Sequence, residues 1–221
     1  MTKQILENIY FYDKLTNDEK NLVDNSFIVK EYKKGEILHE HTDTCLGFVH
    51  VINGVLRSYL MSDDGREVTL YTVDSGESDI LSASCVINQI SFDSFLIADT
   101  DCEVLIIPVT IMAKIKEKNI YAYAAVMELT ADRFSDAMWA MQQIMFMKLD
   151  ERIASFLIDL SVKNNSNRLD ITHEEIAKNI SATREASSRM LKRMQSDGLI
   201  EYQRGKIEII DMKRLKGLLS L

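Results

Sequence analysis

Residues 169–211 read LDITHEEIAKNISATREASSRMLKRMQSDGLIEYQRGKIEIID and carry the strongest structural signal in the sequence. Thr172 is followed three residues later by Glu175, a capping-box pattern that predicts the start of a short helix. A brief turn over residues 180–182 follows, and Thr183 is positioned to cap a second helix. Two helices joined by a short turn, with two short strands after them, indicate a winged helix-turn-helix.

Each of the two helices has an apolar face and a polar face. The apolar residues recur at steps of three and four, which is the helical period. The predicted buried faces are Ile176, Ala177 and Ile180 in the first helix and Ala186, Met190, Leu191 and Met194 in the second. The outer side of the second helix carries Arg184, Glu185, Ser188, Arg189 and Lys192. This layout is typical of a recognition helix.

A two-stranded wing completes the motif, with strands 199–203 and 206–210 joined by Arg204-Gly205. In a helix-turn-helix the second helix enters the major groove of double-stranded DNA. Arginine can donate two hydrogen bonds to guanine and glutamate can accept one from cytosine, which favours a half-site containing G·C pairs. The candidate DNA contacts are Thr172, Thr183, Arg184, Glu185, Ser188, Arg189, Lys192, Arg204 and Lys206, with the last two able to reach phosphate.

The charge is distributed unevenly along the 221 residues, whose net charge is −8. Residues 150–221 hold 13 Lys and Arg against 11 Asp and Glu, whereas the preceding residues hold 13 against 23. Phosphate attracts basic surfaces. The C-terminal third is therefore the part of the chain that can approach nucleic acid.

The N-terminal half reads as a short helix followed by many strands. Thr16 and Glu19 form a capping box for a helix over residues 16–29. Runs rich in β-branched and aromatic residues then recur up to Val109. Asn53-Gly54 and Asp64-Gly65 are predicted to form tight hairpins, because such pairs adopt the positive φ of a type I′ turn. Short strands at roughly ten-residue spacing predict a sandwich or jelly roll.

A long helix is expected from Val109 to about Met147, since it follows the single proline and contains no glycine. The three- and four-residue steps of Val126, Leu129, Arg133, Ala137, Ala140, Ile144 and Met147 mark one stripe along it. We expect this stripe to pair with a second copy of the chain. The alternative is a helix packed on its own barrel. Another helix begins at Leu149, with Ile153, Phe156, Leu157 and Leu160 on one face, and ends at the polar loop 164–167.

Several classes of protein do not fit the sequence. The N-terminus lacks the apolar segment and cleavage site of a secretion signal, and stretches such as 104–112 are too short to span a membrane. The expected location is the cytoplasm, without membrane association. Cys45, Cys85 and Cys102 are too widely spaced for a disulfide framework and are interpreted as small buried residues, with redox sensing as the alternative.

The residues resemble the Crp/Fnr family of bacterial transcription regulators over nearly the whole chain. The resemblance rests on Lys34-Gly35-Glu36, Asn53-Gly54, Gly76-Glu77, Cys102-Glu103-Val104, the segment 150–154 and the recognition segment 183–189. It implies an α+β fold with three parts. These are a jelly-roll sensor domain of the cyclic-nucleotide-binding type over residues 1–108, a dimerisation helix over 109–147 and a winged helix-turn-helix over 148–221. A homodimer that binds an inverted repeat, works with RNA polymerase and is not an enzyme is also implied.

Departures from the family concern the effector. Members that bind cyclic AMP hold its phosphate with an Arg-Ser pair, where this chain has Phe92 and Asp93. Because Asp93 would repel a phosphodiester, cyclic AMP is not the expected effector. Iron–sulfur members use closely spaced cysteines near the N-terminus, and this sequence has none before Cys45. We therefore expect no such cluster, and the sequence identifies no cofactor.

The family places its effector between the β-roll and the long helix. The resemblance implies an apolar lining with a few polar anchors, which suits a small apolar or aromatic ligand. The candidate effector residues are Glu77, Leu81, Ser82, Cys85, Phe92, Asp93, Phe95, Met138 and Met141. The alternative is that these side chains simply pack and no ligand binds.

Three other functions remain as alternatives. His39-Glu40-His41 resembles the start of a cupin metal motif, but positions 45 and 46 are Cys and Leu where a glutamate is needed, so His50 would have to complete a metal site. A haem-bound gas sensor of the same architecture would use Cys85 or a nearby histidine as axial ligand. A hydrolase is disfavoured because no Ser/His/Asp order is present.

Overall fold

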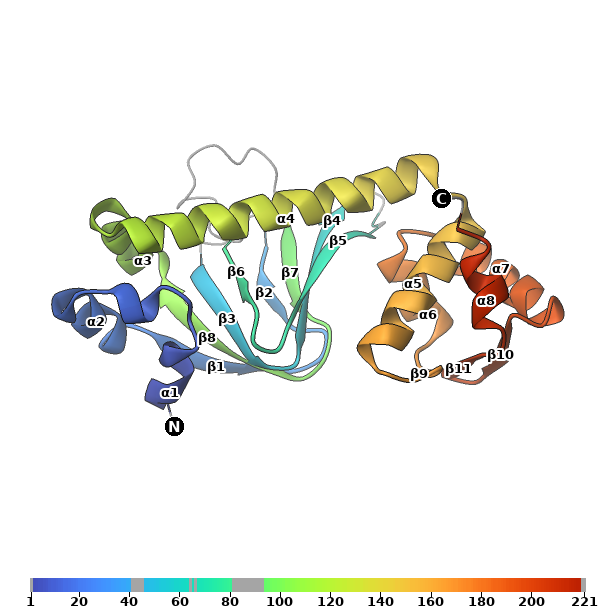
Figure 1. Cartoon of the computed structure of the whole chain (residues 1–221), viewed down its shortest axis with the longest axis horizontal. Helices are drawn as coiled ribbons and strands as arrows, with labels where there is room; N and C mark the ends of the chain where they lie inside the picture. The colour runs from blue at the N-terminus through green and yellow to red at the C-terminus, as the bar shows by residue number, and fades with distance from the viewer. Residues whose placement is uncertain (1, 41–45, 64, 66, 81–93, 220–221) are drawn as a thin grey trace. The chain divides into compact units, whose positions relative to one another are not determined.

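The computed structural model describes residues 2–40, 46–63, 65, 67–80 and 94–219. The chain forms two compact units (Figure 1), one of residues 1–63 and 70–138 and the other of residues 64–69 and 139–221. The first combines short helices with two antiparallel sheets, and the second combines helices with a small sheet. The predicted α+β fold class is confirmed.

The first unit is a β-roll flanked by helices. Its elements are α1 (Thr2–Glu7), a 3-10 turn η1 (Tyr12–Lys14), α2 (Asn17–Asp24), β1 (Ile28–Tyr32), β2 (Ile37–His39), β3 (Gly47–Asn53), β4 (Val55–Met61), β5 (Glu67–Asp74), β6 (Ser78–Asp79), β7 (Phe95–Ala98), β8 (Cys102–Pro108), α3 (Val109–Lys118) and, up to Met138, α4 (Ile120–Phe146). One sheet has the order β1-β8-β3-β6 and the other β2-β7-β4-β5. Apolar residues of both sheets, among them Val49, Leu56 and Val104, form a shared buried core.

The turn at Asn53-Gly54 differs from the predicted hairpin. Strands β3 and β4 lie in different sheets, so the chain crosses from one sheet to the other at this point. Only Gly54 has a positive φ, at +95°. A Cβ there would lie 2.4 Å from Cβ of Cys102 and 2.5 Å from the carbonyl oxygen of Asp101. Glycine is therefore required by close backbone approach and not by a type I′ turn.

Helix α2 begins as predicted and ends earlier. Both halves of the capping box are present, with the Thr16 amide 2.8 Å from a Glu19 carboxylate oxygen and the Glu19 amide 3.4 Å from the Thr16 hydroxyl. The helix stops at Asp24, and Ile28 starts β1, which pairs antiparallel with β8. The β-branched residues at 28 and 29 belong to that strand.

The helical stretch after Pro108 is divided in two at Asn119, whose backbone is extended. The Asn119 side-chain oxygen accepts hydrogen bonds from the amides of Tyr121 and Ala122, at 3.0 and 3.2 Å, and so caps α4. Its side-chain nitrogen donates to Glu19 at 2.8 Å. Asparagine at this position ends one helix, starts the next and ties both to the N-terminal segment.

Much of the stripe predicted to form a dimer contact instead faces the β-roll of its own chain. Val126 is 1% exposed and Arg133 is 8% exposed. Leu129 and Ala137 pack against the buried clusters of the same unit. The spacing identified an apolar stripe correctly, but this part of it covers the barrel, which was the alternative interpretation. In Figure 1 the part of α4 that belongs to this unit crosses above the strands.

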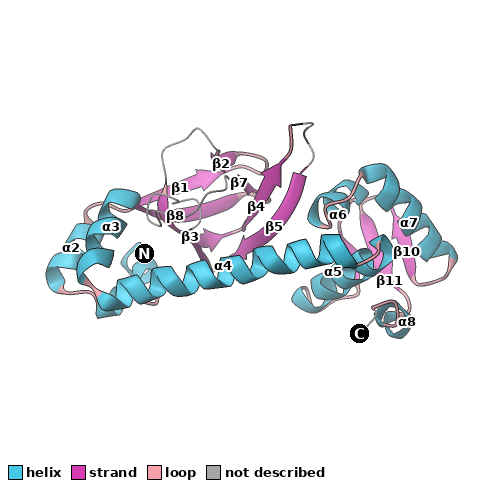
Figure 2. Cartoon of the chain, turned by 90° about the horizontal axis from the view of Figure 1, so that it is seen from above, coloured by secondary structure: helices cyan, strands magenta, loops and turns pink. Residues whose placement is uncertain are grey.

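The second unit combines helices with a three-stranded sheet; Figure 2 shows α5 to α8 around β10 and β11. Its elements are α5 (Leu149–Lys163), β9 (Arg168–Asp170), α6 (His173–Asn179), α7 (Arg184–Ser196), β10 (Ile200–Gln203), β11 (Lys206–Ile209) and α8 (Met212–Lys216). The sheet order is β10-β11-β9, so β9 adds a strand that was not predicted. Ile153 and Leu157 of α5 are fully buried in the core, as expected, and Phe156 and Leu160 pack partly buried against it.

Candidate nucleic-acid interface

Helices α6 and α7 have the N-terminal caps that the sequence predicts. The Thr172 hydroxyl accepts from the Glu175 amide at 3.2 Å, and the Thr172 amide donates to the Glu175 carboxylate at 2.9 Å. The Thr183 hydroxyl accepts from the Ala186 amide at 3.2 Å. Both threonines thereby satisfy helix-end amides that would otherwise lack partners.

The turn between the helices depends on an unusual backbone conformation at Ser181, whose φ is +54°. The Ser181 amide donates to the carbonyl of Lys178 at 3.2 Å, and the Ala182 amide donates to that of Ala177 at 2.9 Å. This is the Schellman pattern, which usually has glycine or asparagine at the left-handed position. Helices α5 and α7 end with the same pair of hydrogen bonds, and their left-handed positions are occupied by Asn165 and Gly198. Ser181 thus carries backbone strain.

Arg152 of α5 fixes the turn from outside the motif. Its guanidinium Nη1 donates to the carbonyl oxygen of Ile180 at 3.0 Å, at the C-terminal end of α6. Burial lowers the pKa of Arg152. The guanidinium thereby satisfies a carbonyl at the end of α6 and holds α5 against the helix-turn-helix.

Helix α7 buries one face and exposes a basic one. Leu191 and Met194 are buried as predicted, whereas Ala186 and Met190 are only half-buried. The fully buried position between them is Ser187, whose hydroxyl makes no hydrogen bond within the described residues. A small polar residue at the centre of the face gives no hydrophobic signal. The exposed residues include Arg184, Glu185, Arg189 and Lys192.

Ser188 is the exception among the predicted contacts on α7, because it is only half-exposed. Its hydroxyl oxygen lies 3.0 Å from Nδ1 of His173 on α6. The His173 ring also packs on Tyr202 of β10, with centroids 4.0 Å apart. Part of the hydrogen-bonding capacity of Ser188 is therefore used inside the domain. His173 was not identified from the sequence, since nothing in the local pattern pairs it with a serine 15 residues away.

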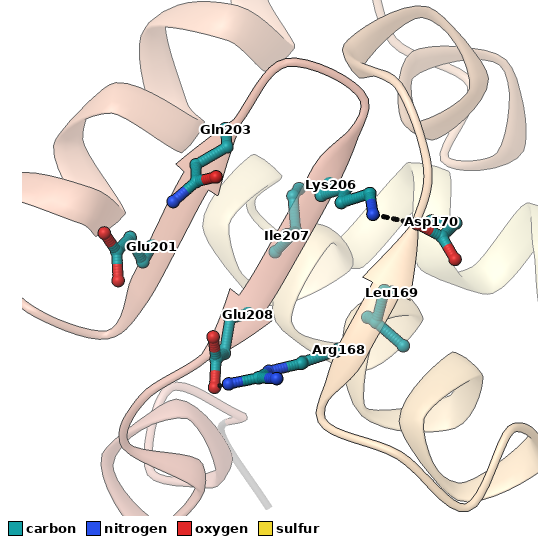
Figure 3. Close-up of a pocket in the computed structure, with 8 residues that line it drawn as sticks. All are labelled: Arg168, Leu169, Asp170, Glu201, Gln203, Lys206, Ile207 and Glu208. Carbon is teal, nitrogen blue, oxygen red and sulfur yellow. Dashed lines mark ion pairs between the residues drawn. The ribbon is translucent and has the colours of Figure 1, made fainter.

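The wing hairpin is confirmed, with Gln203 opposite Lys206 across the turn that Arg204 and Gly205 make. Arg204 and Lys206 are exposed. A groove of about 410 Å³ lies on the outer face of the three-stranded sheet, and Figure 3 shows the residues that line it. There Lys206 Nζ lies 3.7 Å from Asp170, and Arg168 Nε lies 3.1 Å from Glu208. With Glu201 beside them, this face has mixed charge and is less basic than the exposed side of α7.

The candidate effector residues are only partly described. Leu81, Ser82, Cys85, Phe92 and Asp93 lie outside the described residues. Phe95 of β7 stacks on Tyr59, with ring centroids 5.1 Å apart. Met138 and Met141 are exposed on α4. Glu77 accepts a hydrogen bond from the Asp74 amide at 3.0 Å.

A buried polar cluster beside Glu77 was missed. Arg133 of α4 donates from Nη2 to the Ser78 carbonyl at 2.8 Å and from Nη1 to Asp136 at 3.0 Å. Its Nε lies 3.6 Å from the carboxylate of Asp79. The guanidinium also lies over the ring of Tyr71, 4.9 Å from its centroid. Arg133 was predicted as a member of the dimer stripe, but it joins α4 to β6 of the same chain.

Two of the three histidines of the alternative metal site lie within the described residues. His39 lies in β2 and His50 in β3, which belong to different sheets. His50 Nδ1 lies 2.9 Å from the Ser78 hydroxyl, and burial lowers its pKa. No group of three potential metal ligands occurs within the described residues, and His41 lies outside them. Cys102 is a buried free thiol whose pKa burial raises, so its thiolate is disfavoured. Cys45 and Cys85 lie outside the described residues.

Comparisons with known proteins agree with this architecture. Residues 29–119 match the family model of the cyclic nucleotide-binding domain, and residues 151–218 match that of the Crp-like helix-turn-helix domain. A crp/fnr-family protein of known structure from Eubacterium rectale is 39% identical, with 97% of this chain and 100% of that one covered and a TM-score of 0.90. The transcriptional activator protein FnrA of Stutzerimonas stutzeri is 26% identical over 187 residues, which cover 81% of this chain and 75% of the relative. The fold is shared with the regulator CLP of Xanthomonas campestris, at 20% identity and a TM-score of 0.73 over 89% of this chain and 100% of that one.

A β-roll followed by a winged helix-turn-helix defines a class of transcription regulators that couple a sensor domain to a DNA-binding domain. The chain belongs to the Crp/Fnr family of transcription regulators. Its helix-turn-helix domain is of the DNA-binding type, and its relatives are regulators. Within the described residues, no helix is long and apolar enough to cross a membrane.

Proposed function

We propose that the protein is a cytoplasmic homodimer that binds an inverted-repeat operator in double-stranded DNA and is controlled by a small effector. The observation that carries the proposal is the exposed basic face of α7, presented by a capped helix-turn-helix with a wing. The helix carries Arg184, Arg189, Lys192 and Arg193 against a single acidic residue, Glu185. A positive helix face attracts the phosphate backbone and brings side chains to base edges.

The exposed residues divide into two roles. Arg184, Glu185 and Arg189 lie in the first two turns of α7, the part that contacts bases in a helix-turn-helix, and are proposed to read G·C pairs. Lys192, Arg204 and Lys206 are proposed to contact phosphate. The Lys206–Asp170 pair does not oppose this role, because its side chains are 74% and 85% exposed and such a pair is readily exchanged for phosphate.

The second copy is proposed to pack on a different stripe of α4 from the one that covers the β-roll. Met127, Phe134 and Met141 are seven residues apart, and Met138 and Met145 occupy the intervening positions of the same heptad. All five side chains are exposed, Phe134 to 65%. A heptad of large apolar residues on one exposed face favours a paired helix over contact with water. A two-fold dimer would present two copies of α7 to an inverted repeat.

The effector site is proposed at the face of the β-roll that α4 covers, where Glu77, Asp79 and Arg133 meet. Phe92 and Asp93 in the sequence support the proposal that the effector is not cyclic AMP. Likewise, the lack of cysteines before Cys45 supports a sensor without an N-terminal iron–sulfur cluster. RNA polymerase is the proposed protein partner, because the relatives are transcription regulators.

The base-reading roles are tested by binding to an operator and to variants with single base-pair changes. Arg189→Ala is expected to weaken operator binding by about 1–3 kcal/mol and to relax the preference at one base pair of each half-site. Lys206→Ala is the comparison, because losing a phosphate contact weakens all sequences equally and lowers the salt dependence. An Arg189→Ala protein that keeps the parental preference would contradict the proposed docking of α7.

A further inference from the structure

His173 occupies a position where three elements of the DNA-binding domain meet. It is the first residue of α6, directly after the capping Thr172. Its Nδ1 lies 3.0 Å from the hydroxyl of Ser188 on α7. Its ring lies 4.0 Å from that of Tyr202 on β10, the first strand of the wing, with 36° between the ring planes. One side chain thus touches α6, the recognition helix and the wing.

The bond to Ser188 differs from the other contacts between α6 and α7. Most of this interface is an apolar core that includes Ile176 and Leu191, and such contacts are not directional. The ion pair of Arg184 with Glu174 is long, at 4.0 Å, and more than half exposed, so it restrains the helices only weakly. A hydrogen bond requires a defined distance and angle. Ser188 lies one turn beyond Arg184 and directly before Arg189, so a restraint at Ser188 restrains the rotation of the base-reading part of α7 about its axis.

The surroundings of the imidazole disfavour its charged form. Burial lowers the pKa of His173, and the positive charges of Lys192 and Arg184 lower it further. Its Nε2 atom is buried and makes no hydrogen bond within the described residues. A charged ring there would have a buried N–H without a partner beside two cations, which is costly. The side chain is therefore suited to a fixed structural contact and not to a direct ion pair with phosphate.

We propose that His173 is a positioning residue for DNA recognition, which locks the rotation of α7 through Ser188 and anchors it to the wing through Tyr202. This inference rests on the proposed function, since it assumes that α7 reads the operator. A locked helix places Arg184, Glu185 and Arg189 at fixed base edges. Without the lock the helix keeps its fold and charge but loses part of its discrimination between sequences.

The test is a double-mutant cycle on the full-length protein. His173→Phe keeps a ring against Tyr202 and removes the polar contact, whereas Ser188→Ala removes the other partner. Operator affinity should fall about five- to tenfold in each single variant. The double variant should bind the operator as tightly as the single variant with the lower affinity, because both changes remove the same contact. Affinity for a scrambled duplex should stay within about twofold of the parent, because phosphate contacts are unchanged. Additive losses, or equal losses on both duplexes, would overturn the proposal.

Two further variants distinguish a role in positioning α7 from a general disturbance of the fold. His173→Asn keeps a polar atom near the position of Nδ1, so it should recover most of the specific affinity that His173→Phe loses. Ser196→Ala is the matched control on α7, because the Ser196 hydroxyl bonds its own helix, at the carbonyl of Lys192, and no other group in the described part of the chain. It should bind as the parent does. If the parent selects no operator, the proposed function fails; if the parent binds and all variants bind alike, only the role of His173 fails.

Discussion

The buried guanidinium of Arg133 gives the sharpest prediction for stability. Replacing it with methionine keeps a long side chain against the barrel and removes the positive charge. The change deletes the hydrogen bond to the Ser78 carbonyl and the cation beside Asp79. The side chains of Arg133 and Asp79 are only 9% and 1% exposed, so water cannot readily replace these interactions.

The expected loss follows from this burial. Removing one member of a buried ion pair costs about 3–5 kcal/mol. The lower end applies here, because the Arg133–Asp79 distance of 3.6 Å is that of an ion pair without a close hydrogen bond and methionine retains packing. With a urea slope of roughly 2 kcal/mol per M, Arg133→Met should lower the unfolding midpoint of the β-roll by about 1–2 M.

Urea unfolding followed by circular dichroism measures this shift. Lys33→Met is the matched control in the same unit, because Lys33 pairs with Asp101 at 3.0 Å but both side chains are more than half exposed. The control should unfold at the parental midpoint. Adding Asp79→Asn to Arg133→Met should restore part of the loss, since it removes the buried negative charge. A midpoint for Arg133→Met equal to that of Lys33→Met would show that the buried Arg133 interactions do not stabilise the β-roll.

Three other outcomes follow from the structure. Ser181→Gly should stabilise the DNA-binding domain by about 1 kcal/mol, seen in calorimetry as a rise of about 4 °C or more, because glycine relieves the strain at a φ of +54°; an unchanged transition would contradict this. Phe134→Glu should convert the dimer to a monomer in sedimentation, whereas Tyr121→Glu, which is exposed but off the heptad, should not; a dimeric Phe134→Glu protein would place the interface elsewhere. Because the folded pKa of His173 lies below its ordinary value of 6.5, the unfolded chain binds the proton first, so stability should be full above about pH 7 and fall as the pH drops below about 6.5. The fall should be smaller in His173→Phe, which lacks the titratable imidazole that faces Arg184, Lys192, Ser188 and Tyr202. A pH profile of this variant identical to that of the parent would contradict the role of this histidine.

Local patterns predicted the helix caps and the turn of the wing well, because these signals depend on residues close together in the sequence. Capping boxes at Thr16 and Thr172 depend on residues three apart, and both are confirmed. The hairpin turn of the wing likewise depends on neighbouring residues and lies at Arg204-Gly205. The family resemblance supplied the order of the domains, which such local patterns do not contain.

The errors concern contacts between distant segments. The helical period shows that α4 has apolar stripes, but it does not show which stripe faces the barrel. Nor does the sequence indicate that Arg133, in the middle of one stripe, pairs with Asp79, which lies 54 residues earlier. Gly54 was predicted to be a hairpin residue. The sequence does not show that Cys102 of another strand packs against it and leaves no room for a side chain. The contact between His173 and Ser188 likewise requires the packed domain.

Selection of bound sequences from random duplex DNA distinguishes a dimeric, sequence-specific regulator from a protein that binds DNA without sequence preference. It should enrich a palindrome with G·C-containing half-sites about one helical turn apart, because a two-fold dimer presents its two recognition helices at that spacing. Binding should weaken steeply with salt, yet the preference for the palindrome over scrambled DNA should persist. Failure to enrich any sequence, or enrichment of a single half-site without symmetry, would contradict a dimeric, sequence-specific regulator.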